Sequence, residues 1–298
     1  MTAQHKSVLI FGATGNVGSA AAQYAAKVPN PPKIILALRD VKKPTPGLPA
    51  DQYPRIHADL SDAGSLERAA RESGATAALV YITFGAKGDM KPELEALVRG
   101  GIKHIVLLSS ASVQPDNKSI KPTEFIAHSH AIVELAIESL PIHATFVRPG
   151  AFTTNTFWWS DEIKQKSSIL AAYSDSTMAY IDTTDIGNVC ASVLVNPPAE
   201  NHLGIYLEGP KEVSVREAAK TIGEVVGREV RVEEVSEEEF RKRNTQFPKE
   251  ALDSILKYQR EGMEGFGNTS LAANVEKWTG KPATTFRQFV ERNKQRFL

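Results

Sequence analysis

The first half of the chain alternates between short apolar runs and longer stretches with helical periodicity. Short runs rich in Val, Ile and Leu are typical of strands buried on both faces of a sheet. They predict strands at residues 7–12, 33–38, 55–58, 76–84, 103–108 and 142–147. Apolar residues that recur every three or four positions predict helices between them, at residues 17–26, 61–73, 92–99 and 123–139. Strands that alternate with helices favour a parallel sheet with right-handed crossovers, so the predicted fold class is α/β.

The second half is less regular. The aromatic-rich segment 152–159 is predicted to leave the sheet and cover its edge, and a helix at 186–195 precedes a last strand at 205–207. From residue 210 onward the pattern is mainly helical, with capping-box spacing at three helix starts and a small strand at 230–235. These patterns predict one domain over 1–155, completed by about 181–209, and a smaller, mainly helical substrate lobe over 156–180 and 210–298.

A glycine-rich turn joins the first predicted strand to its helix, with the sequence Gly12-Ala13-Thr14-Gly15-Asn16-Val17-Gly18. Gly12 permits a sharp turn, Gly15 lets the backbone approach a pyrophosphate, and Gly18 lets the helix pack close to the sheet. The N–H groups from Thr14 to Val17 then face the phosphates. The alternative is a turn that only packs the strand against the helix. The strand–turn–helix context favours dinucleotide binding by a Rossmann-type parallel sheet.

Basic residues follow the second predicted strand, where this fold meets the adenosine ribose. Arg39 comes first, and Lys42 and Lys43 follow shortly after it. An arginine here suits a 2′-phosphate, whereas an acid suits a free 2′-hydroxyl. Arg39 and Lys43 therefore favour NADP(H) over NAD. The alternative is that Asp40 binds the ribose hydroxyls while the bases remain solvated.

Other candidate ligand contacts stand at the predicted strand ends, because ligands of such sheets bind beyond the carboxyl edge. Asp59 is placed to edge an adenine ring. Phe84 and Pro149 end two further strands and are also assigned to the cofactor, and Ser110 ends the strand between them. The site is therefore expected at this edge.

Composition narrows the function classes. Formal net charge is zero over 298 residues, so bulk charge attracts neither nucleic acid nor an anionic membrane. The short polar start predicts no secretory signal, and no apolar stretch approaches the length of a membrane span, so we expect a cytoplasmic protein. The lone cysteine, Cys190, lies in an apolar helical pattern and is predicted to be a buried thiol. The seven histidines are scattered, and no metal site is predicted.

Further motifs extend over nearly the whole chain. They are Val147-Arg148-Pro149-Gly150, the run 180–187, Leu207-Glu208-Gly209-Pro210 and Trp278-Thr279-Gly280-Lys281-Pro282. With the glycine turn, they resemble the NmrA-like branch of atypical short-chain dehydrogenases/reductases, and most of all its quinone-oxidoreductase-like members. The resemblance implies a Rossmann domain, bound NADP(H) and a cleft between two lobes. The family includes NADPH-dependent reductases, nucleotide-sensing regulators and rearrangement enzymes, so the activity stays open.

The helix after the fifth strand lacks the Tyr-x-x-x-Lys pair of ordinary short-chain reductases. If His130 occupies the Lys position, Ile126 occupies the Tyr position, and the usual proton donor is missing. The resemblance implies that His130 replaces the lysine, bonding the ribose hydroxyls or relaying a proton. Glu134, one turn away, would orient or charge it. Alternatively, His130 belongs to an apolar helical face and is a core histidine.

Two other sets of side chains are candidates for chemistry. Ser110 stands where such reductases often place a hydroxyl beside the nicotinamide or the substrate carbonyl, although it is equally suited to cap its own loop. Tyr81, Tyr173 and Tyr180 are possible proton donors, but strand and loop aromatics more often serve packing.

The missing tyrosine bears on the substrate. Reduction of a quinone gives a phenolate whose conjugate acid titrates near ~10, so water can protonate it, and an iminium needs no proton. We therefore expect a quinone, azo, enone or iminium acceptor rather than an unactivated ketone. The aromatic segment offers Phe152, Phe157 and Trp158 as a lining for a flat acceptor, or as core of the lobe.

The predicted function is an NADPH-dependent reductase that transfers a hydride to an activated small-molecule acceptor. Two alternatives remain. One is a regulator that senses NADP(H) and binds a protein partner, or a second copy of itself, without turnover. The other is an isomerase or rearrangement enzyme of secondary metabolism that retains its cofactor.

Overall fold

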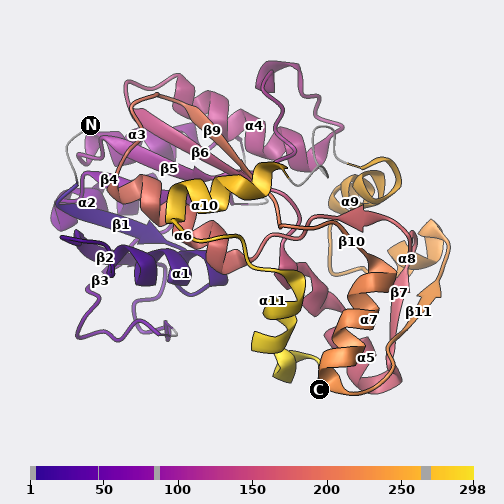
Figure 1. The fold of residues 1–298 in the computed structure, drawn as a ribbon. Helices are drawn as coiled ribbons and strands as arrows, with labels where there is room; N and C mark the ends of the chain where they lie inside the picture. The colour runs from indigo at the N-terminus through magenta and orange to yellow at the C-terminus, as the bar shows by residue number, and fades with distance from the viewer. Residues whose placement is uncertain (1–4, 46, 84–87, 263–269) are drawn as a thin grey trace.

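A seven-stranded parallel sheet forms the centre of the large domain (Figure 1). The structure, a computed structural model, describes residues 5–45, 47–83, 88–262 and 270–298. In spatial order the strands are β3 (Arg55–His57), β2 (Lys33–Leu38), β1 (Ser7–Phe11), β4 (Ala77–Tyr81), β5 (His104–Leu108), β6 (His143–Pro149) and β9 (Leu203–Leu207). The chain order reverses between β1 and β4, which creates the crevice where this fold binds ligands. The predicted Rossmann-type parallel sheet is confirmed.

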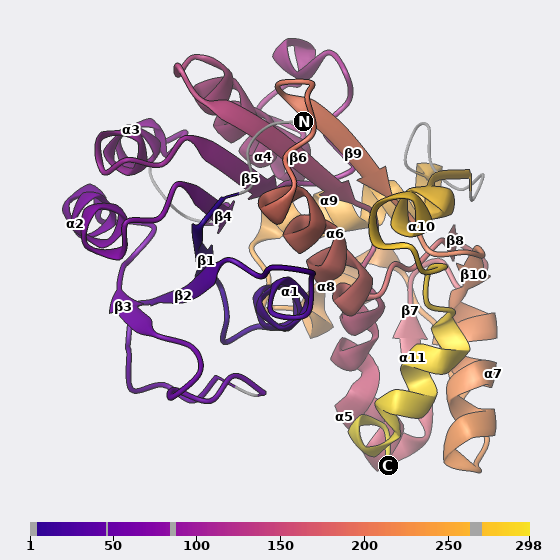
Figure 2. The ribbon, with the colours of Figure 1, turned by 60° about the vertical axis from the view of Figure 1, so that its left-hand side comes forward.

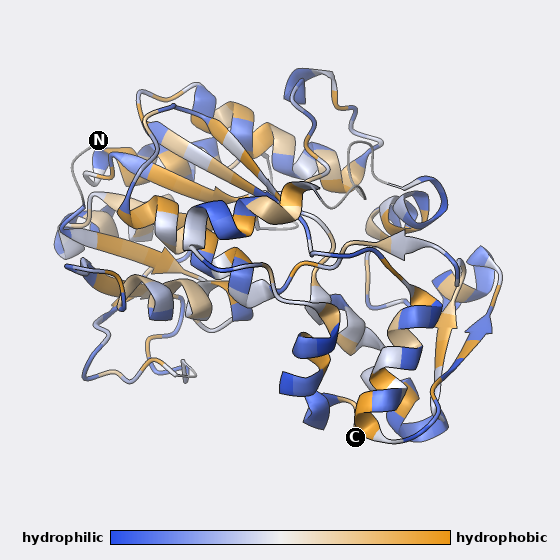
Figure 3. Cartoon of the chain, in the orientation of Figure 1, coloured by the Kyte–Doolittle hydropathy of each residue, from blue (hydrophilic) through white to orange (hydrophobic). Residues whose placement is uncertain are grey.

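Helices cover both faces of the sheet (Figures 1 and 2). Side chains alternate along β1: Val8 and Ile10 face one core, and Leu9 and Phe11 face the other. The first core is closed by α1 (Asn16–Ala25), α6 (Thr183–Val195) and α10 (Ala273–Thr279). The second is closed by α2 (Ala63–Ser73), α3 (Lys91–Arg99) and α4 (Phe125–Glu138). Figure 3 shows the apolar strands enclosed between these two helical layers.

The small lobe is mainly helical, as predicted, and has its own apolar core. Its helices are α5 (Ser160–Lys166), α7 (Val215–Val226), α8 (Glu237–Arg243), α9 (Lys249–Glu261) and α11 (Phe286–Arg292). It also contains two small sheets, which pair β7 (Ser168–Ala171) with β11 (Arg231–Glu234) and β8 (Thr177–Met178) with β10 (Val213–Ser214). The predicted strand at 230–235 is therefore present; its partner β7 was not predicted. Single 3₁₀ turns occur at Asn117–Ser119, Ser270–Ala272 and Lys294–Arg296.

The C-terminal segment differs from the predicted division of the chain. Residues 210–298 were assigned to the small lobe, but α10 packs on the large domain. Val275 is buried in the core beneath α6, and Ser192 Oγ donates to the Trp278 carbonyl at 2.6 Å. The chain returns to the lobe at α11, whose capping box at Thr285 and Gln288 is formed as predicted.

Two aspartates of the 180–187 motif join the large domain to the small lobe. Asp182 caps α6 by accepting a hydrogen bond from the Thr184 N–H at 2.7 Å, and it also pairs with Arg292 of α11. Asp185 accepts the Thr284 N–H at 2.7 Å. This motif therefore holds the lobe against the sheet.

Cys190 is fully buried in α6, as predicted, and burial raises the pKa of its thiol. Among the described residues, no helix combines the length and apolar character that a membrane span requires.

Candidate functional site

The glycine turn presents an uncapped helix start at the carboxyl edge of β1. Gly15 is the N-cap of α1, and no side chain caps the helix there. Thr14 and Asn16 are exposed, and Val17 is half-buried. The N–H groups of the first turn are therefore accessible to an anion, as a bound pyrophosphate requires.

Two glycines allow this turn to form. Gly12 has φ +72°, in the left-handed region that glycine adopts without strain. A Cβ on Gly18 would lie 2.4 Å from the carbonyl of Gly12, so only glycine allows the helix to start this close to the strand. The Gly15 N–H donates to the Gly12 carbonyl at 2.8 Å, which closes the turn. This cradle fits the diphosphate of a dinucleotide.

The residues that follow β2 favour Arg39 as the side chain that binds a 2′-phosphate. Arg39 and Lys43 are exposed. Asp40 turns back on its own loop, where its Oδ1 accepts the Lys42 N–H at 2.9 Å. This bond orders the loop, while Arg39 and Lys43 keep their charged ends in solvent beside the strand end.

Asp59 lies half-buried next to β3, at the same edge. Burial opposes its ionisation, but hydrogen bonds from Ser61 and the charge of Arg39 lower the pKa of this carboxyl. Ser61 Oγ donates to Asp59 Oδ1 at 2.8 Å. Asp59 is therefore ionised at neutral pH, and its Oδ1 orders the loop that would border the adenine. Phe84, which was also assigned to the cofactor, lies outside the described residues.

A cavity of about 440 Å³ lies between the sheet edge and the small lobe. The large domain lines it with Ser109, Ser110, Ile126, His130, Pro149 and Gly150. Three residues that the sequence analysis singled out, Ser110, His130 and Pro149, thus lie along one wall of the cavity. The other walls come from the lobe, including the segment 151–159 and helices α8 and α9.

Ser110 begins a tight turn at the end of β5. Its carbonyl accepts the Val113 N–H at 3.1 Å, and its Oγ accepts the Ser112 N–H at 3.2 Å. The hydroxyl therefore caps its own loop, as one interpretation of the sequence held, and it also lines the cavity. Both roles are compatible because a hydroxyl accepts and donates at once.

His130 is 8% exposed and lines the cavity from α4. Its Nδ1 lies 2.9 Å from the Ile126 carbonyl oxygen. Because a carbonyl only accepts, Nδ1 carries the hydrogen, and in the neutral ring Nε2 carries the lone pair. Burial lowers the pKa of His130 to about 4, although the bond to Ile126 opposes this shift. The ring is therefore neutral at pH 7, and its Nε2 accepts hydrogen bonds.

Glu134, one turn further along α4, is fully buried and is bound by residues of two strand ends. Ser109 Oγ donates to its Oε1 at 2.5 Å. Arg148 of β6 donates from Nε at 3.0 Å and from Nη2 at 2.5 Å, so the pair is bidentate. The sequence prediction gave Glu134 the task of orienting or charging His130. In the structure its carboxylate instead fixes α4, which carries His130, against β5 and β6.

The aromatic segment divides between the cavity and the core. It folds as a 3₁₀ helix, η2 (Thr153–Trp159). Phe152 and Trp158 line the cavity, and Trp158 is 47% exposed at its mouth. Phe157 points the other way: its ring lies 5.4 Å from Phe289 and 5.7 Å from Phe297, between ring centres. The prediction that Phe157 lines the substrate site is thus corrected to a role in the lobe core.

Sequence reasoning missed the wall that α8, α9 and the loop between them supply. It consists of Phe240, Arg243, Asn244, Gln246, Phe247, Leu252, Ile255, Tyr258 and Gln259. The amphipathic pattern of α9 marks an apolar face, but it does not say which part of the fold that face meets.

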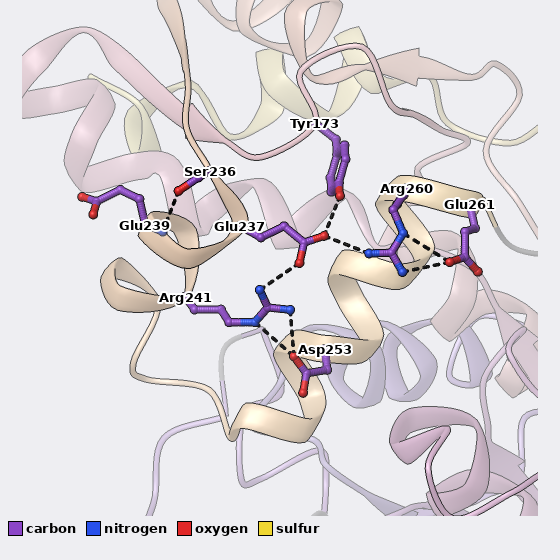
Figure 4. Close-up of polar contacts among 8 residues, drawn as sticks. All are labelled: Tyr173, Ser236, Glu237, Glu239, Arg241, Asp253, Arg260 and Glu261. Atoms are coloured by element: carbon purple, nitrogen blue, oxygen red, sulfur yellow. Dashed lines mark hydrogen bonds and ion pairs between the residues drawn. The ribbon is translucent and has the colours of Figure 1, made fainter.

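Ion pairs hold this wall in place (Figure 4). Glu237 of α8 accepts hydrogen bonds from Tyr173 at 2.5 Å, from Arg241 at 2.8 Å and from Arg260 of α9 at 2.9 Å. Arg241 also donates to Asp253 of α9 at 2.9 Å. All of these groups are partly exposed, so solvent screens each pair and no single pair contributes much to stability. Together they join the two helices to the loop after β7.

Fold and site together define a dinucleotide-binding α/β protein with a small-molecule cavity at its strand ends. The chain belongs to the NmrA-like family, whose sequence model matches residues 4–289.

Individual relatives differ in their named roles. The chain is 33% identical to the nitrogen metabolite regulation-like protein bik4 of Gibberella fujikuroi, over 98% of this chain and 97% of that protein. It is 27% identical to (4-alkanoyl-5-oxo-2,5-dihydrofuran-3-yl)methyl phosphate reductase of Streptomyces griseus, over 97% and 99%. The NADPH complex of an NADPH-dependent quinone oxidoreductase from Escherichia coli superimposes with a TM-score of 0.76 at 20% identity, covering 96% of this chain and 99% of that one. This last likeness shows the shared fold.

Proposed function

We propose that the protein is an NADPH-dependent reductase that transfers a hydride to an activated small-molecule acceptor such as a quinone, an enone or an iminium. The observation that carries this proposal is the cavity at the sheet edge. It brings Ser110, His130 and Pro149 together with an aromatic wall of the lobe. Such a cavity offers space for an acceptor beside a nucleotide bound at the strand ends.

The chain's own residues fit the nucleotide at two points. Gly12, Gly15 and Gly18 form a cradle for the diphosphate, and Arg39 with Lys43 supplies cations for a 2′-phosphate. Reduced nicotinamide, when bound, supplies a hydride. The NADPH-bound oxidoreductase among the similar structures supports the same cofactor, and the named reductase supports the same class of reaction.

His130 has the chemistry to orient the nicotinamide ribose. Its neutral ring offers a lone pair on Nε2, so it accepts a hydrogen bond from a ribose hydroxyl, whereas lysine in the same place would donate one. The Glu134–Arg148 pair keeps α4 in register with the strand ends. His130 is therefore proposed as a binding and positioning group rather than as an acid, because its ring carries no dissociable proton on Nε2 at pH 7.

The cavity favours flat acceptors. Phe152, Trp158 and Phe247 supply aromatic faces, and the rings of Trp158 and Phe247 pack edge to face with centres 4.7 Å apart. Aromatic walls bind planar π-systems through stacking. If His130 takes the lysine position of ordinary short-chain reductases, Ile126 takes that of their tyrosine, which favours acceptors that need no strong acid on that helix.

The first test is a titration of NADPH, NADP⁺, NADH and NAD⁺ against the purified protein. We expect NADPH to bind tightest and Arg39→Ala to remove its advantage over NADH. Arg71→Ala is the matched control. Arg71 is also an exposed arginine, but it lies in the last turn of α2, where it pairs with Glu67. Binding of oxidised nucleotides alone, or of none, would contradict hydride donation.

The second candidate is a nucleotide-sensing regulator, which the 33% identity to a regulation-like protein favours. It shares the nucleotide site and differs in turnover. An acceptor screen that starts with quinones separates the two: the reductase consumes NADPH, whereas the regulator discriminates between nucleotide redox states without consuming any. Product formed without net loss of NADPH would indicate an isomerase.

A further inference from the structure

The connection from β2 to β3 carries the basic residues assigned to a 2′-phosphate (Figures 1 and 2). Residues 39–45, its first part, belong to no helix or strand. A segment of this kind has many conformations available, and ordering it costs entropy. Arg39 directly follows β2 and is placed by the strand end, whereas Lys43 lies four residues further along. The contacts that order Lys43 therefore decide whether the two cations can act together.

Arg55, the first residue of β3, donates hydrogen bonds to three atoms of this segment. Its Nη1 donates to the Val41 carbonyl at 3.0 Å and to the Lys43 carbonyl at 3.3 Å. Its Nη2 donates to Thr45 Oγ1 at 2.8 Å. The donors of a guanidinium are fixed relative to one another in one plane. One side chain thus holds residues 41–45 in a single arrangement.

Both backbone groups of Lys43 are bound. Its N–H donates to the Asp40 carbonyl at 3.1 Å, which closes a turn, and its carbonyl accepts from Arg55. The next contact along the chain is that of Thr45, whose Oγ1 donates to the Leu48 carbonyl at 2.8 Å. The backbone from which the exposed Lys43 side chain extends is therefore ordered before any ligand binds.

The sheet gives Arg55 a fixed position. Strand β3 pairs with β2 in parallel, and Arg55 stands opposite Leu36, two residues before β2 ends. The side chain of Arg55 is half-buried. It therefore holds residues 41–45 relative to the same strand end that carries Arg39.

We propose that Arg55 sets the preference for NADPH over NADH by holding Lys43 where it joins Arg39 at the 2′-phosphate. The inference rests on the proposed nucleotide site and adds a positioning residue, which acts through Lys43 and does not touch the phosphate. A phosphate monoester carries up to about two negative charges at pH 7, so a second cation strengthens its binding. NADH has no 2′-phosphate, and its affinity should not depend on Lys43.

The rest of the connection is anchored independently of Arg55. Leu48 and Tyr53 are buried in the core that α1 covers. A change at Arg55 should therefore release residues 41–45 and leave the fold intact, so that variants at this position can be assayed by binding.

The decisive experiment measures the affinities of NADPH and NADH for Arg55→Gln by titration calorimetry. Glutamine is shorter and cannot bind the three acceptors at once. We expect NADPH affinity to fall about tenfold, because fewer molecules hold the competent loop, while NADH affinity stays unchanged. Thr45→Val removes one acceptor and should give a smaller loss in the same direction. Arg71→Gln, which removes an exposed arginine paired with Glu67, is the matched control and should change neither affinity.

Two further variants separate position from charge. Arg55→Lys keeps the cation but replaces the planar fork by a single nitrogen, so most of the NADPH preference should still be lost. Full recovery in Arg55→Lys would overturn the proposal, because charge alone would then be sufficient. Lys43→Ala should lower the preference by itself, and adding Arg55→Gln should lower it little further, since the two residues act in series. Additive losses, or equal losses of NADPH and NADH affinity in Arg55→Gln, would also overturn it.

Hydrogen exchange of the nucleotide-free protein gives a readout that needs no ligand. In Arg55→Gln the amides of residues 41–45 should exchange faster while those of β2 keep their rates, and unchanged exchange at 41–45 refutes the anchoring. If the wild-type protein does not prefer NADPH, or if Arg39→Ala leaves the preference intact, the proposed phosphate site fails and the role of Arg55 with it. A preference that Arg39→Ala removes and Arg55→Gln leaves intact refutes the role of Arg55 alone.

Discussion

The buried ion pair of Glu134 and Arg148 offers the sharpest test of how the site is held. Glu134 is fully buried and Arg148 is 6% exposed, so both charges are removed from water. Glu134→Gln keeps the shape of the side chain but leaves the guanidinium without its counter-charge. Ser109 retains an acceptor, so the change acts mainly on Arg148.

The expected loss follows from the geometry. Breaking a buried, hydrogen-bonded pair by removing one partner typically costs about 3–5 kcal/mol, because the remaining charge is uncompensated. The bidentate contact and the low exposure place this pair within that range. For a chain of this size the melting temperature should fall by roughly 10 °C. The free energy of unfolding is measured by urea titration at pH 7, with thermal unfolding as a second method.

Two further variants make the result interpretable. Glu67→Gln removes a carboxylate that pairs with Arg71 and Arg99 at the surface, and should cost no more than about 1 kcal/mol per pair. Replacing both buried charges, as Glu134→Leu with Arg148→Met, should recover most of the loss, since an apolar pair needs no hydration. A Glu134→Gln variant as stable as Glu67→Gln would refute the reasoning.

Three other predictions concern two buried histidines and the glycine turn. The free energy of unfolding should fall as pH drops from about 6.5 to about 4, because buried neutral His130 takes up its proton only on unfolding. The pKa of about 4 in the folded protein, against 6.5 in the unfolded chain, corresponds to about 3 kcal/mol. A urea midpoint that stays constant over this pH range would contradict this prediction. His104, whose pKa burial and the charges of His143 and His5 lower to about 3, adds to the same slope, so His104→Gln should flatten the profile. Gly18→Ala should abolish tight NADPH binding and destabilise the fold, since its Cβ would meet backbone; unchanged calorimetric affinity would show that the turn tolerates a side chain.

The ion pairs between α8 and α9 give a further prediction, which steady-state kinetics in rising salt can check. Glu237→Gln should raise KM for the acceptor several-fold while NADPH affinity is unchanged. In the wild-type protein, rising salt should screen the same ion pairs and so raise KM for the acceptor as well. Equal changes in KM for the acceptor and in NADPH affinity would show that the substitution disturbs the whole molecule rather than the cavity wall.

Local patterns account for the parts of the fold that the sequence predicted. The glycine turn, the strand ends and the basic residues after β2 each depend on neighbours within a few positions, so the positions of Gly18, Arg39 and Ser110 in the fold could be predicted, whereas their roles stay predictions. The parallel sheet followed from the alternation of strands and helices. Ser110 and His130 were brought to one cavity wall because both sit at the carboxyl edge.

Contacts between distant segments account for what it missed. Glu134 and Arg148 lie in apolar stretches, where an isolated charge signals a buried partner, but nothing local says which one. Phe157 and Trp158 are adjacent in the chain yet face the core and the cavity, because a 3₁₀ turn sends consecutive side chains in different directions.

Isotope transfer from the cofactor follows the proposed hydride itself. NADPH deuterated at the transferable position is mixed with the protein and an iminium acceptor, and the product is examined by mass spectrometry. We expect one deuterium bound to carbon in the product and an equal amount of NADP⁺ formed. Tight binding of NADPH with no deuterium delivered to any acceptor in the screen would rule out hydride transfer and favour the regulator.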